Sequence, residues 1–400
     1  MKRYLVLLAL FVLSLITYID RVAISSAKAP LAADLSLSDQ AMGWVFSAFA
    51  LGYAMAQIPA GWFADKFGPR RALTAVVLAW SLFTALTGGA QGLTVLVIIR
   101  FLFGVGEAGA FPGSARAIFN WLPPSERGRA NGILFSGSRL GGALAFPLLA
   151  WMLDGWGWRR SFVWLGTLGV LWAAVWLLWF RDHPAQSVAQ ETATSTGLSF
   201  GEIFGSRPML LTMLQYFASN FTFFICLSWM LPYLKDSYKL TNGEAAGYAM
   251  IPLLFGATAQ WVAGFAVDRL YNSRWRAWSR RLPALCGFAL AMVGMLAVTQ
   301  AVSPGIAVAC FALATFGADM TISPSWSYCL DIGGKNSGAV SGSMNMIGNL
   351  GSFVSANAFP FLLGVTGSAQ AYFVVAALLS LVAFLCWLLM RPPATAVGAI

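Results

Sequence analysis

Residues 4–27 read YLVLLALFVLSLITYIDRVAISSA, an apolar run that contains one adjacent acid and base, Asp20 and Arg21. About 20 apolar residues are enough for one α-helix to cross the hydrocarbon core of a bilayer. A charge at the bilayer centre costs roughly 2.5–3.5 kcal/mol on insertion scales, so charged side chains there generally face a bundle interior or a watery pathway. The segment therefore predicts a membrane-spanning helix with one functional, inward-facing side.

Four further charges lie inside long apolar segments in the same way. They are Arg100, Glu107, Arg139 and Asp319. Charges inside membrane helices are rare and mark ion or substrate pathways. The pattern is typical of a transporter.

The composition agrees with a membrane protein. Hydrophobic residues make up 58% of the chain and charged residues 10%, against roughly 25% charged in a soluble domain. The net charge of +10 does not indicate a nucleic-acid partner, because the Lys and Arg residues are not gathered on one face with aromatic residues between them.

Apolar segments long enough to cross a bilayer recur along the whole chain, separated by Gly, Pro and charged clusters. They lie near residues 4–27, 41–63, 72–89, 94–118, 129–153, 160–180, 209–234, 244–266, 283–302, 305–328, 338–363 and 369–390. We therefore predict an all-α polytopic protein of the lipid bilayer, with twelve transmembrane helices.

The distribution of Lys and Arg predicts the orientation of these helices. With the N-terminus inside, the cytoplasmic side carries Lys2, Arg3, Lys66, Arg70, Arg71, Arg127, Arg129, Arg181, Arg207, Arg269, Arg274, Arg276, Arg280, Arg281, Lys335 and Arg391. The other side keeps Lys28, Arg159, Arg160, Lys235 and Lys239. Because an excess of Lys and Arg marks cytoplasmic loops, both termini are expected in the cytoplasm. Short termini and loops favour the inner membrane of a bacterial cell.

The first segment also resembles a secretory signal peptide, since Met1-Lys2-Arg3 precedes it and Ala27-Lys28-Ala29 follows it. However, the run is longer than a signal-peptide core and contains the Asp20-Arg21 pair. We expect it to remain as the first membrane span.

No pattern of an enzyme or a cofactor site is present. The cysteines fall within predicted spans and form no C-x-x-C motif, so neither a metal site nor a disulfide framework is predicted. The single histidine, His183, is expected to be a solvated loop residue. Without a nucleophile and base or a metal-ligand cluster, we predict a protein that is not an enzyme and that needs no cofactor.

The chain divides near its middle. Residues 183–208 are polar and rich in Ser and Thr, and they predict a cytoplasmic linker between an N-terminal six-helix bundle, residues 1–182, and a C-terminal one, residues 209–400. The halves also echo each other. Gly61-x-x-x-Asp65 matches Gly264-x-x-x-Asp268, and Glu107 followed by Pro112 matches Asp319 followed by Pro324. A third echo pairs Phe146-Pro147 with Phe359-Pro360. Two bundles related by an axis along the membrane normal would place both acids at comparable depths.

Two motifs resemble those of a known family. The run Gly61-x-x-x-Asp65-Lys66-x-Gly68-x-Arg70-Arg71 is similar to the loop signature of the major facilitator superfamily, and Arg100-x-x-x-Gly104 is similar to its second motif. The resemblance covers nearly the whole chain. It implies the major facilitator fold, in which two pseudo-symmetric six-helix bundles form one pathway, so a monomer is expected.

Three further motifs resemble one branch of that superfamily, the anion:cation symporter family. They are Tyr18-Ile-Asp20-Arg21, the run from Gly104 through Glu107 to Pro112, and Trp121-x-Pro-Pro-x-Glu126-Arg-Gly-Arg129. The family includes proton-coupled carriers of galactonate, hexuronates and glucarate, and relatives of sialin. The resemblance implies that Asp20 and Glu107 carry protons, that Arg21 and Arg100 serve substrate binding and coupling, and that Tyr18 and Tyr53 line the cavity.

The chemistry of these residues agrees with an anionic substrate. The planar fork of a guanidinium gives a carboxylate two parallel charge-assisted hydrogen bonds, and Arg21 is the first candidate. Arg100 and Glu107 are seven residues apart and share one helical face. A buried carboxylic acid generally has a raised pKa, which an approaching arginine lowers again, so a movement that separates the two would couple proton binding to conformation. A static salt-bridge network between the first and fourth segments is the alternative for Asp20 and Glu107.

Polar residues are candidates to bind the hydroxyl groups of a sugar acid. Tyr53 and Gln57 share one face of the second segment. In the second half Ser323, Ser325 and Trp326 follow Asp319, and Asn345 and Asn349 share a face. Helix packing is the alternative for these side chains, because small and amide residues also join membrane helices.

The loop motif predicts a gate. Gly61 lets two helices approach closely, and Asp65 is placed to cap and to pair with Arg70 or Arg71 near the cytoplasmic ends. These four residues are expected to favour one closed arrangement and not to touch the substrate.

Two features depart from the sugar-acid carriers. Ser138-Arg139 stands where those carriers more often have an uncharged amide or a small residue. Arg139 lies ten residues beyond Arg129, about 15 Å into a core of ~30 Å. Asp319 is an additional acid of the second half. Either Arg139 pairs with an acid such as Asp319, or Ser138 and Arg139 bind a second carboxylate or a phosphate.

The sequence thus predicts a secondary active transporter that carries an organic anion together with protons by alternating access, with the direction of transport left open. A sugar acid (an aldonate, hexuronate or aldarate) is the expected substrate. An exchanger of organic phosphate or other anions, or a uniporter without proton coupling, is the alternative. Neutral substitutions at Asp20 and Glu107 would leave exchange intact but abolish concentrative uptake.

Overall fold

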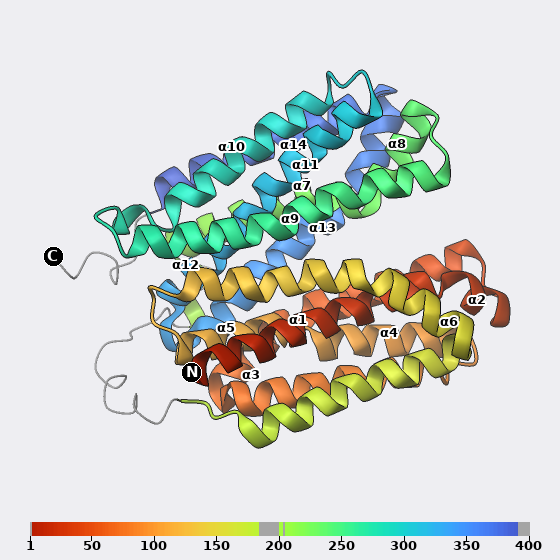
Figure 1. Cartoon of the computed structure of the whole chain (residues 1–400), viewed down its shortest axis with the longest axis horizontal. Helices are drawn as coiled ribbons and strands as arrows, with labels where there is room; N and C mark the ends of the chain where they lie inside the picture. Colours follow the sequence, from red (N-terminus) through yellow and green to blue (C-terminus); the bar gives the residue numbers. More distant parts are fainter. Residues whose placement is uncertain (1, 184–199, 203–204, 391–400) are drawn as a thin grey trace. The chain divides into compact units, whose positions relative to one another are not determined.

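The computed structural model describes residues 2–183, 200–202 and 205–390, and within these ranges every regular element is a helix (Figure 1). Most of the predicted linker, residues 183–208, lies outside the described residues. The α-helices are α1 (Lys2–Ser26), α2 (Lys28–Asp34), α3 (Asp39–Thr87), α4 (Leu93–Glu107), α5 (Ala110–Trp121), α6 (Arg127–Trp179), α7 (Arg207–Ser228), α8 (Met230–Tyr238), α9 (Asn242–Tyr271), α10 (Arg281–Val298), α11 (Pro304–Met320), α12 (Ile322–Gly333), α13 (Ser337–Thr366) and α14 (Gln370–Leu389). Short 3-10 turns cover Phe200–Glu202, Arg276–Trp278 and Gly334–Asn336.

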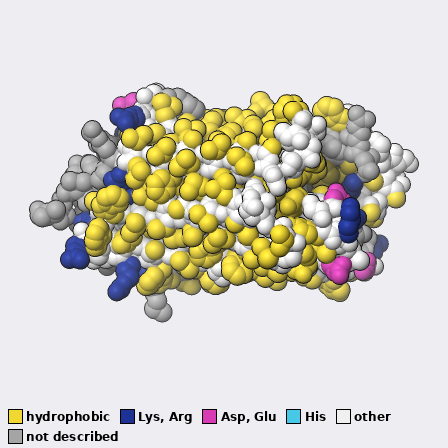
Figure 2. Space-filling view, turned by 90° about the horizontal axis from the view of Figure 1, so that it is seen from above, with side chains coloured by type: hydrophobic (Ala, Val, Ile, Leu, Met, Phe, Trp, Pro, Cys, Tyr) yellow, Lys and Arg dark blue, Asp and Glu magenta, His cyan; other side chains and the backbone are white. Residues whose placement is uncertain are grey.

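The helices fit a membrane by length and composition. Nine described segments are long and apolar enough to cross a bilayer, among them Arg3–Ser26 and Gln370–Leu389. The visible face in Figure 2 is mostly hydrophobic, with charged side chains near its ends. The prediction of an all-α polytopic membrane protein is confirmed.

The chain forms two compact units. Unit 1 contains Met1–Trp121, Gly137–Leu198 and Gly333–Gly342, and unit 2 contains Leu122–Ser136, Ser199–Ile332 and Ser343–Ile400. The core of unit 1 joins α1, α2, the start of α3, α4 and α6, and that of unit 2 joins α7, α8, α10, α11, α13 and α14.

Helix α3 contains two predicted spans. Its 49 residues would extend about 73 Å if straight, more than twice the ~30 Å hydrocarbon core. At Gly68 the backbone leaves the helical region, with φ 80° and ψ 153°, and the chain reverses. Gly109 shows the reversal, because it contacts both arms of α3. A Cβ added to Gly109 would lie 3.2 Å from Ala60, which precedes the turn, and 2.6 Å from Val76, which follows it. Gly157, with φ 72°, interrupts α6 in the same way.

Proline explains why two other predicted spans are each split in two. A proline has no N–H to donate to the carbonyl four residues before it, and its ring crowds that turn. Pro112 therefore interrupts the helix at Ala108, between α4 and α5, which follow one another along one line in Figure 1. Pro324 likewise interrupts it at Met320, between α11 and α12. Glu107 is thus the last residue of α4, and Asp319 the last but one of α11.

Candidate functional site

A buried ion pair lies inside unit 1. The guanidinium of Arg21 on α1 donates a hydrogen bond from Nε to Oε1 of Glu107 at the end of α4. The Glu107 side chain is fully buried and that of Arg21 is 19% exposed. The second carboxylate oxygen of Glu107, Oε2, has no hydrogen-bond partner in the described part of the chain. The two residues that the sequence assigned to substrate and proton are therefore in direct contact.

Aromatic rings surround Arg21. Its guanidinium carbon lies 5.1 Å from the ring centre of Tyr18, 5.4 Å from that of Phe49, 4.5 Å from that of Tyr53 and 6.0 Å from that of Phe111. A guanidinium is attracted to the negative face of such rings within about 6 Å. Tyr18 and Tyr53, both predicted site residues, thus lie beside the predicted anion-binding group.

Phe49 lies close to two arginines, a relationship that the sequence did not predict. Its ring centre is 5.4 Å from the guanidinium carbon of Arg21 and 5.1 Å from that of Arg100. Arg100, on α4, is buried and also lies 4.5 Å from the ring centre of Phe103. The ring is therefore close to two positive charges inside the unit.

Asp20 lies beside an aromatic residue outside this cluster. Adjacent residues of a helix point about 100° apart, so the Asp20 side chain leaves α1 in a different direction from that of Arg21. The carboxyl group of Asp20 is 2% exposed and lies beside the indole of Trp80 on α3, with Arg100 and Glu107 as the charged groups acting on it. Neither of its oxygens completes a hydrogen bond of normal geometry with a described residue.

The remaining predicted substrate residues of unit 1 lie on α6. Ser138 is buried and Arg139 is partly buried. This stretch runs beside α1, since a Cβ on Gly137 would lie 2.7 Å from the carbonyl of Phe11 and one on Gly141 would lie 2.5 Å from that of Leu15. The pairing of Arg139 with Asp319 stays a prediction.

In unit 2, Asp319 is fully buried next to α9, where a Cβ on Gly256 would lie 2.0 Å from its Oδ2 atom. The nearby hydroxyls serve contacts between and within helices. Ser323 donates to the carbonyl of Gly128 at 2.7 Å, and Ser325 donates to that of Thr321 at 2.6 Å. For Ser323 the geometry favours the packing alternative.

Two predicted amides lie on α13. Asn345 is 7% exposed and Asn349 is partly buried. The side-chain amide of Asn349 donates to the Asn345 carbonyl at 2.8 Å, so they share one helical face as predicted. On α12, the indole of Trp326 donates to the Tyr216 hydroxyl at 2.9 Å.

The motif aspartate Asp65 caps a distant helix. Its Oδ1 and Oδ2 accept hydrogen bonds at 2.8 and 2.7 Å from the N–H groups of Gly338 and Ala339, in the first turn of α13. Gly61 permits this approach, because a Cβ there would lie 2.3 Å from the carbonyl oxygen of Gly338.

The predicted ion pair between Asp65 and Arg70 or Arg71 is wrong for Arg70. Asp65 pairs instead with Arg116 of α5, at 3.8 Å. Arg70 donates from Nε and Nη2 to the carbonyl of Leu177 at 2.9 and 2.6 Å, and its backbone N–H bonds Asp182. Arg71 is exposed. Arg70 thus joins the turn at Gly68 to the end of α6.

In unit 2, Asp268 makes the same helix-capping contact that Asp65 makes in unit 1. Asp268 accepts hydrogen bonds at 2.8 and 3.0 Å from the N–H groups of Gly128 and Arg129, in the first turn of α6. It also pairs with the Arg129 side chain at 2.8 Å. Gly264 and Gly128 form the close approach there, as Gly61 and Gly338 do in unit 1.

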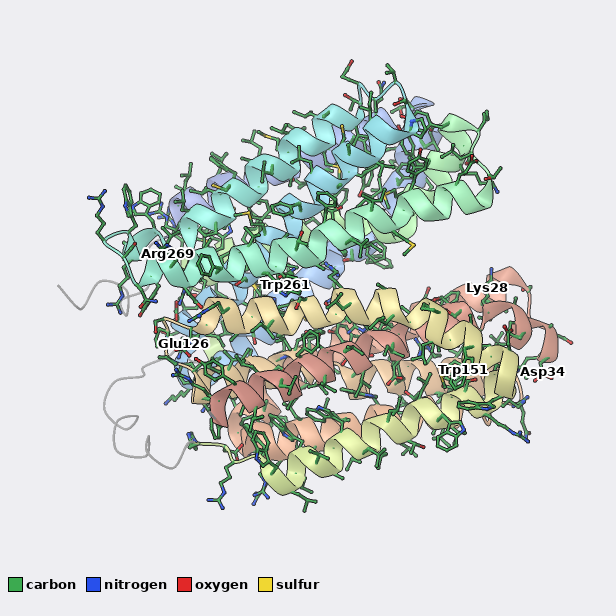
Figure 3. The ribbon with its side chains drawn as sticks, viewed as in Figure 1. Lys28, Asp34, Glu126, Trp151, Trp261 and Arg269 are labelled. Carbon is green, nitrogen blue, oxygen red and sulfur yellow. The ribbon has the colours of Figure 1, made fainter. Side chains whose placement is uncertain are left out.

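Unit 2 contains another buried ion cluster, which the sequence did not predict. Asp331 accepts from Arg127 at 2.9 Å on Oδ1 and from Arg280 at 3.0 Å on Oδ2. Figure 3 shows Glu126, the residue before Arg127, at the start of α6. Among the described residues, no group of three or more His, Cys, Asp or Glu side chains could hold a metal ion.

The chain is similar to known membrane carriers over nearly its whole length. Residues 10–356 match the model of the Major Facilitator Superfamily. A relative from Cupriavidus necator, named a probable sulfoacetate transporter, is 33% identical over 98% of this chain and 94% of its own. The hexuronate transporter of Bacillus subtilis is 30% identical over 93% of this chain and 90% of its own.

Solved structures share the fold at low sequence identity. A proton:xylose symporter has a TM-score of 0.77 at 16% identity, over 97% of this chain and 96% of its own. The human organic anion transporter MFSD10 has a TM-score of 0.76 at 16% identity, over 97% and 100%.

Proposed function

The chain belongs to the major facilitator superfamily and is a multi-pass membrane transporter of organic anions. We propose that it is a proton-coupled symporter of a sugar acid. The aldonates, hexuronates and aldarates are the substrate class. We also propose that the protein works as a monomer in the bacterial inner membrane, with both termini in the cytoplasm.

The observation that carries this proposal is the contact between Arg21 and Glu107. In the structure Arg21 is engaged by a carboxylate that belongs to the protein. An incoming substrate carboxylate must compete with Glu107 for the same guanidinium fork. Protonation of Glu107 removes its negative charge and weakens the ion pair, so Arg21 becomes available to the substrate. Proton binding and anion binding thereby favour each other.

A second acid gives the site a second place for a proton. Asp20 is buried, and the charges of Arg100 and Glu107 act on it. Unlike Glu107, it forms no hydrogen-bonded ion pair with a described cation. A buried charge without a close partner is costly, which favours the neutral acid. With Asp20 neutral, Arg21, Arg100 and Glu107 carry a net charge of +1, and an anion that enters with one proton leaves that balance unchanged.

The substrate's hydroxyl groups would be bound by neighbouring polar side chains. Tyr18 and Tyr53 lie beside Arg21 and can orient a polyol chain relative to its carboxylate. We propose Ser138, Asn345 and Asn349 as further contacts, and Asp319 as an acid of the second half that serves coupling.

Asp65 and Asp268 support a gating role for the repeated motif. Each holds the first turn of a helix by two backbone hydrogen bonds, a contact that must break if those helices separate during transport. We propose that Gly61, Asp65, Arg70 and Arg71 stabilise a closed arrangement at the cytoplasmic ends.

A second candidate substrate is a small dianion such as sulfoacetate. Two observations favour it: the relative named a probable sulfoacetate transporter matches 98% of this chain, and Arg139 adds a second guanidinium inside a predicted span. A dianion would use Arg21 for one acidic group and Arg139 for the other.

The test is substrate-driven proton movement in liposomes that contain the purified protein and a pH dye. Aldonates, hexuronates, aldarates, sulfoacetate and phosphate esters are added outside one at a time. We expect the lumen to acidify with sugar acids, and Glu107→Gln to abolish the signal. Glu244→Gln, the same chemical change at an exposed helix cap, should transport normally. Counterflow of labelled anion without acidification would instead show an exchanger or uniporter and refute the proposed coupling.

A further inference from the structure

A cavity of about 460 Å³ lies in unit 2, and none of the proposed substrate residues lines it. One of its walls is a face of α8, which Figure 1 shows at one end of the unit. The lining residues of this wall have the i, i+3, i+4, i+7 and i+8 spacing of one helical face. They are Trp229, Pro232, Tyr233, Asp236 and Ser237. Ligand pockets occupy roughly 300–1,000 Å³, so the cavity is large enough for a small organic molecule.

The apolar part of the cavity is aromatic and is held in place by the fold. The ring of Trp229 stacks on that of Phe359 from α13, with the ring centres 5.4 Å apart. The Trp229 indole also donates a hydrogen bond to the Ala356 carbonyl at 2.8 Å. Tyr233 lies edge to face with Phe373 of α14, with the ring centres 5.2 Å apart. These contacts hold both lining rings in position before a ligand binds.

The charge of the cavity is negative. Among the described residues that line it, Asp236 alone carries a formal charge. Asp236 is exposed, and within residues 2–183, 200–202 and 205–390 it forms no hydrogen bond or ion pair. Lys235 and Lys239 are close to it in sequence, but neither lines the cavity. The carboxylate is therefore available to a ligand.

Two nitrogen donors on the opposite wall already have partners. The side-chain amide of Gln370 donates to the Thr299 carbonyl at 3.3 Å, and the backbone N–H of Gln370 donates to the Ser368 hydroxyl at 3.2 Å. The groups that dominate the cavity are thus a carboxylate and the faces of aromatic rings. Both attract cations, because an aromatic ring carries negative charge on its face and binds an ammonium group within about 6 Å. An anion would be repelled, so the chemistry does not suit the transported substrate.

We propose that this cavity binds a small, water-soluble organic ammonium compound, whose cationic group lies beside Asp236 and the rings of Trp229 and Tyr233. Three polar residues of the lining, Asp236, Ser237 and Gln370, are exposed, so the cavity is reached from water. The predicted orientation of the helices places this end of unit 2 outside the cell. The ligand has the opposite charge to the substrate, and its binding does not depend on proton coupling.

Calorimetric titration of the full-length protein in detergent tests this site. The probes are choline and 3,3-dimethylbutan-1-ol, which has the shape of choline without its charge. We expect choline to bind about tenfold more tightly, the scale of a cation at an aromatic ring beside a carboxylate. Equal affinities for the two probes, or no binding of choline, would overturn the proposal, because the cavity would then not recognise a cation.

Asp236→Asn removes the charge at nearly constant shape. The variant should bind choline about tenfold less tightly and bind the alcohol as before. Asp154→Asn is the matched control, the same chemical change at an exposed aspartate of unit 1, and it should bind choline normally. If Asp236→Asn keeps the full affinity for choline, the carboxylate does not hold the ligand and the proposal fails.

A pair of variants tests the aromatic wall without changing any charge. Tyr233→Phe keeps the ring and should bind choline as the unmodified protein does. Tyr233→Leu removes the ring and should bind it about fivefold less tightly. Equal affinities in the two variants would contradict a role of the ring. If Tyr233→Leu does not fold, Asp236→Asn still decides the outcome, because its side chain is exposed.

Lipid nanodiscs distinguish a soluble ligand from a lipid headgroup with the same ammonium chemistry. Choline should bind equally well in discs of phosphatidylglycerol and in discs that also contain phosphatidylethanolamine. Weaker binding of choline in the presence of phosphatidylethanolamine would show that the lipid headgroup occupies the cavity, and it would overturn the proposal of a soluble ligand.

Discussion

Asp65 and Asp268 make the same contact in the two units of the chain. Each carboxylate accepts two hydrogen bonds from consecutive backbone N–H groups in the first turn of a helix, α13 for Asp65 and α6 for Asp268. Each aspartate lies four residues after a glycine that permits the helices to touch. The repeat seen in the sequence is therefore a repeat of one capping interaction.

Removing the charge of either aspartate should loosen the helix that it caps. A carboxylate at a helix N-terminus contributes about 0.3–1 kcal/mol, and an amide retains only one acceptor. In hydrogen exchange measured by mass spectrometry, Asp65→Asn should speed exchange in the first turn of α13, and Asp268→Asn in that of α6. Each variant serves as the control for the other, and a common effect on both helices would contradict independent caps.

Arg21→Lys should impair substrate binding more than stability. Lysine keeps the charge but loses the planar fork that holds a carboxylate by two hydrogen bonds. Loss of one charge-assisted hydrogen bond, roughly 1.5–3 kcal/mol, predicts an affinity at least about tenfold weaker. Calorimetric titration with the transported anion measures it. Arg159→Lys, at an exposed ion pair of the same unit, should bind normally, and equal affinities in both variants would remove Arg21 from the site.

Asp20→Asn should separate exchange from concentrative uptake. The amide cannot take up a proton, so accumulation of labelled anion driven by an imposed pH gradient should cease. Counterflow between equal pH values should persist, because Arg21 still binds the anion. Accumulation at the unmodified rate would show that the proton passes through another group.

Gly68→Ala should destabilise the protein at the turn inside α3. Gly68 has φ 80° and ψ 153°, a region essentially restricted to glycine that costs other residues about 1–3 kcal/mol. A Cβ there would also lie 2.7 Å from the Asp182 carboxyl. Thermal unfolding in detergent should occur at a lower temperature. Gly43→Ala, in a helical position of α3 with no atom within 4 Å of the added Cβ, should instead stabilise by about 0.5–1 kcal/mol.

The sequence predicted the features that depend on local composition. Apolar runs showed which segments are helical membrane spans, and the positions of Pro112 and Pro324 agree with the breaks after Glu107 and Asp319. The internal echo anticipated the common role of Asp65 and Asp268.

Features that depend on helix rotation were not predictable from one sequence. Arg116, the partner of Asp65, is 51 residues away and carries no local signal that distinguishes it from Arg70. Trp80 is one of 17 tryptophans in an apolar chain, and only its position beside Asp20 sets it apart. Phe49 became a candidate site residue only when the structure showed that α1 and α4 place two arginines close to its ring.

The helix breaks at Ala108 and Met320 place a mechanical weak point next to each buried acid. The carbonyl of each of these residues has already lost its helical partner to Pro112 or Pro324, so bending there sacrifices no further hydrogen bond of that kind. Glu107 and Asp319 are within one residue of these points. A change of charge at either acid therefore acts next to the point where its helix bends most easily, and a bend there moves the whole helical segment beyond it.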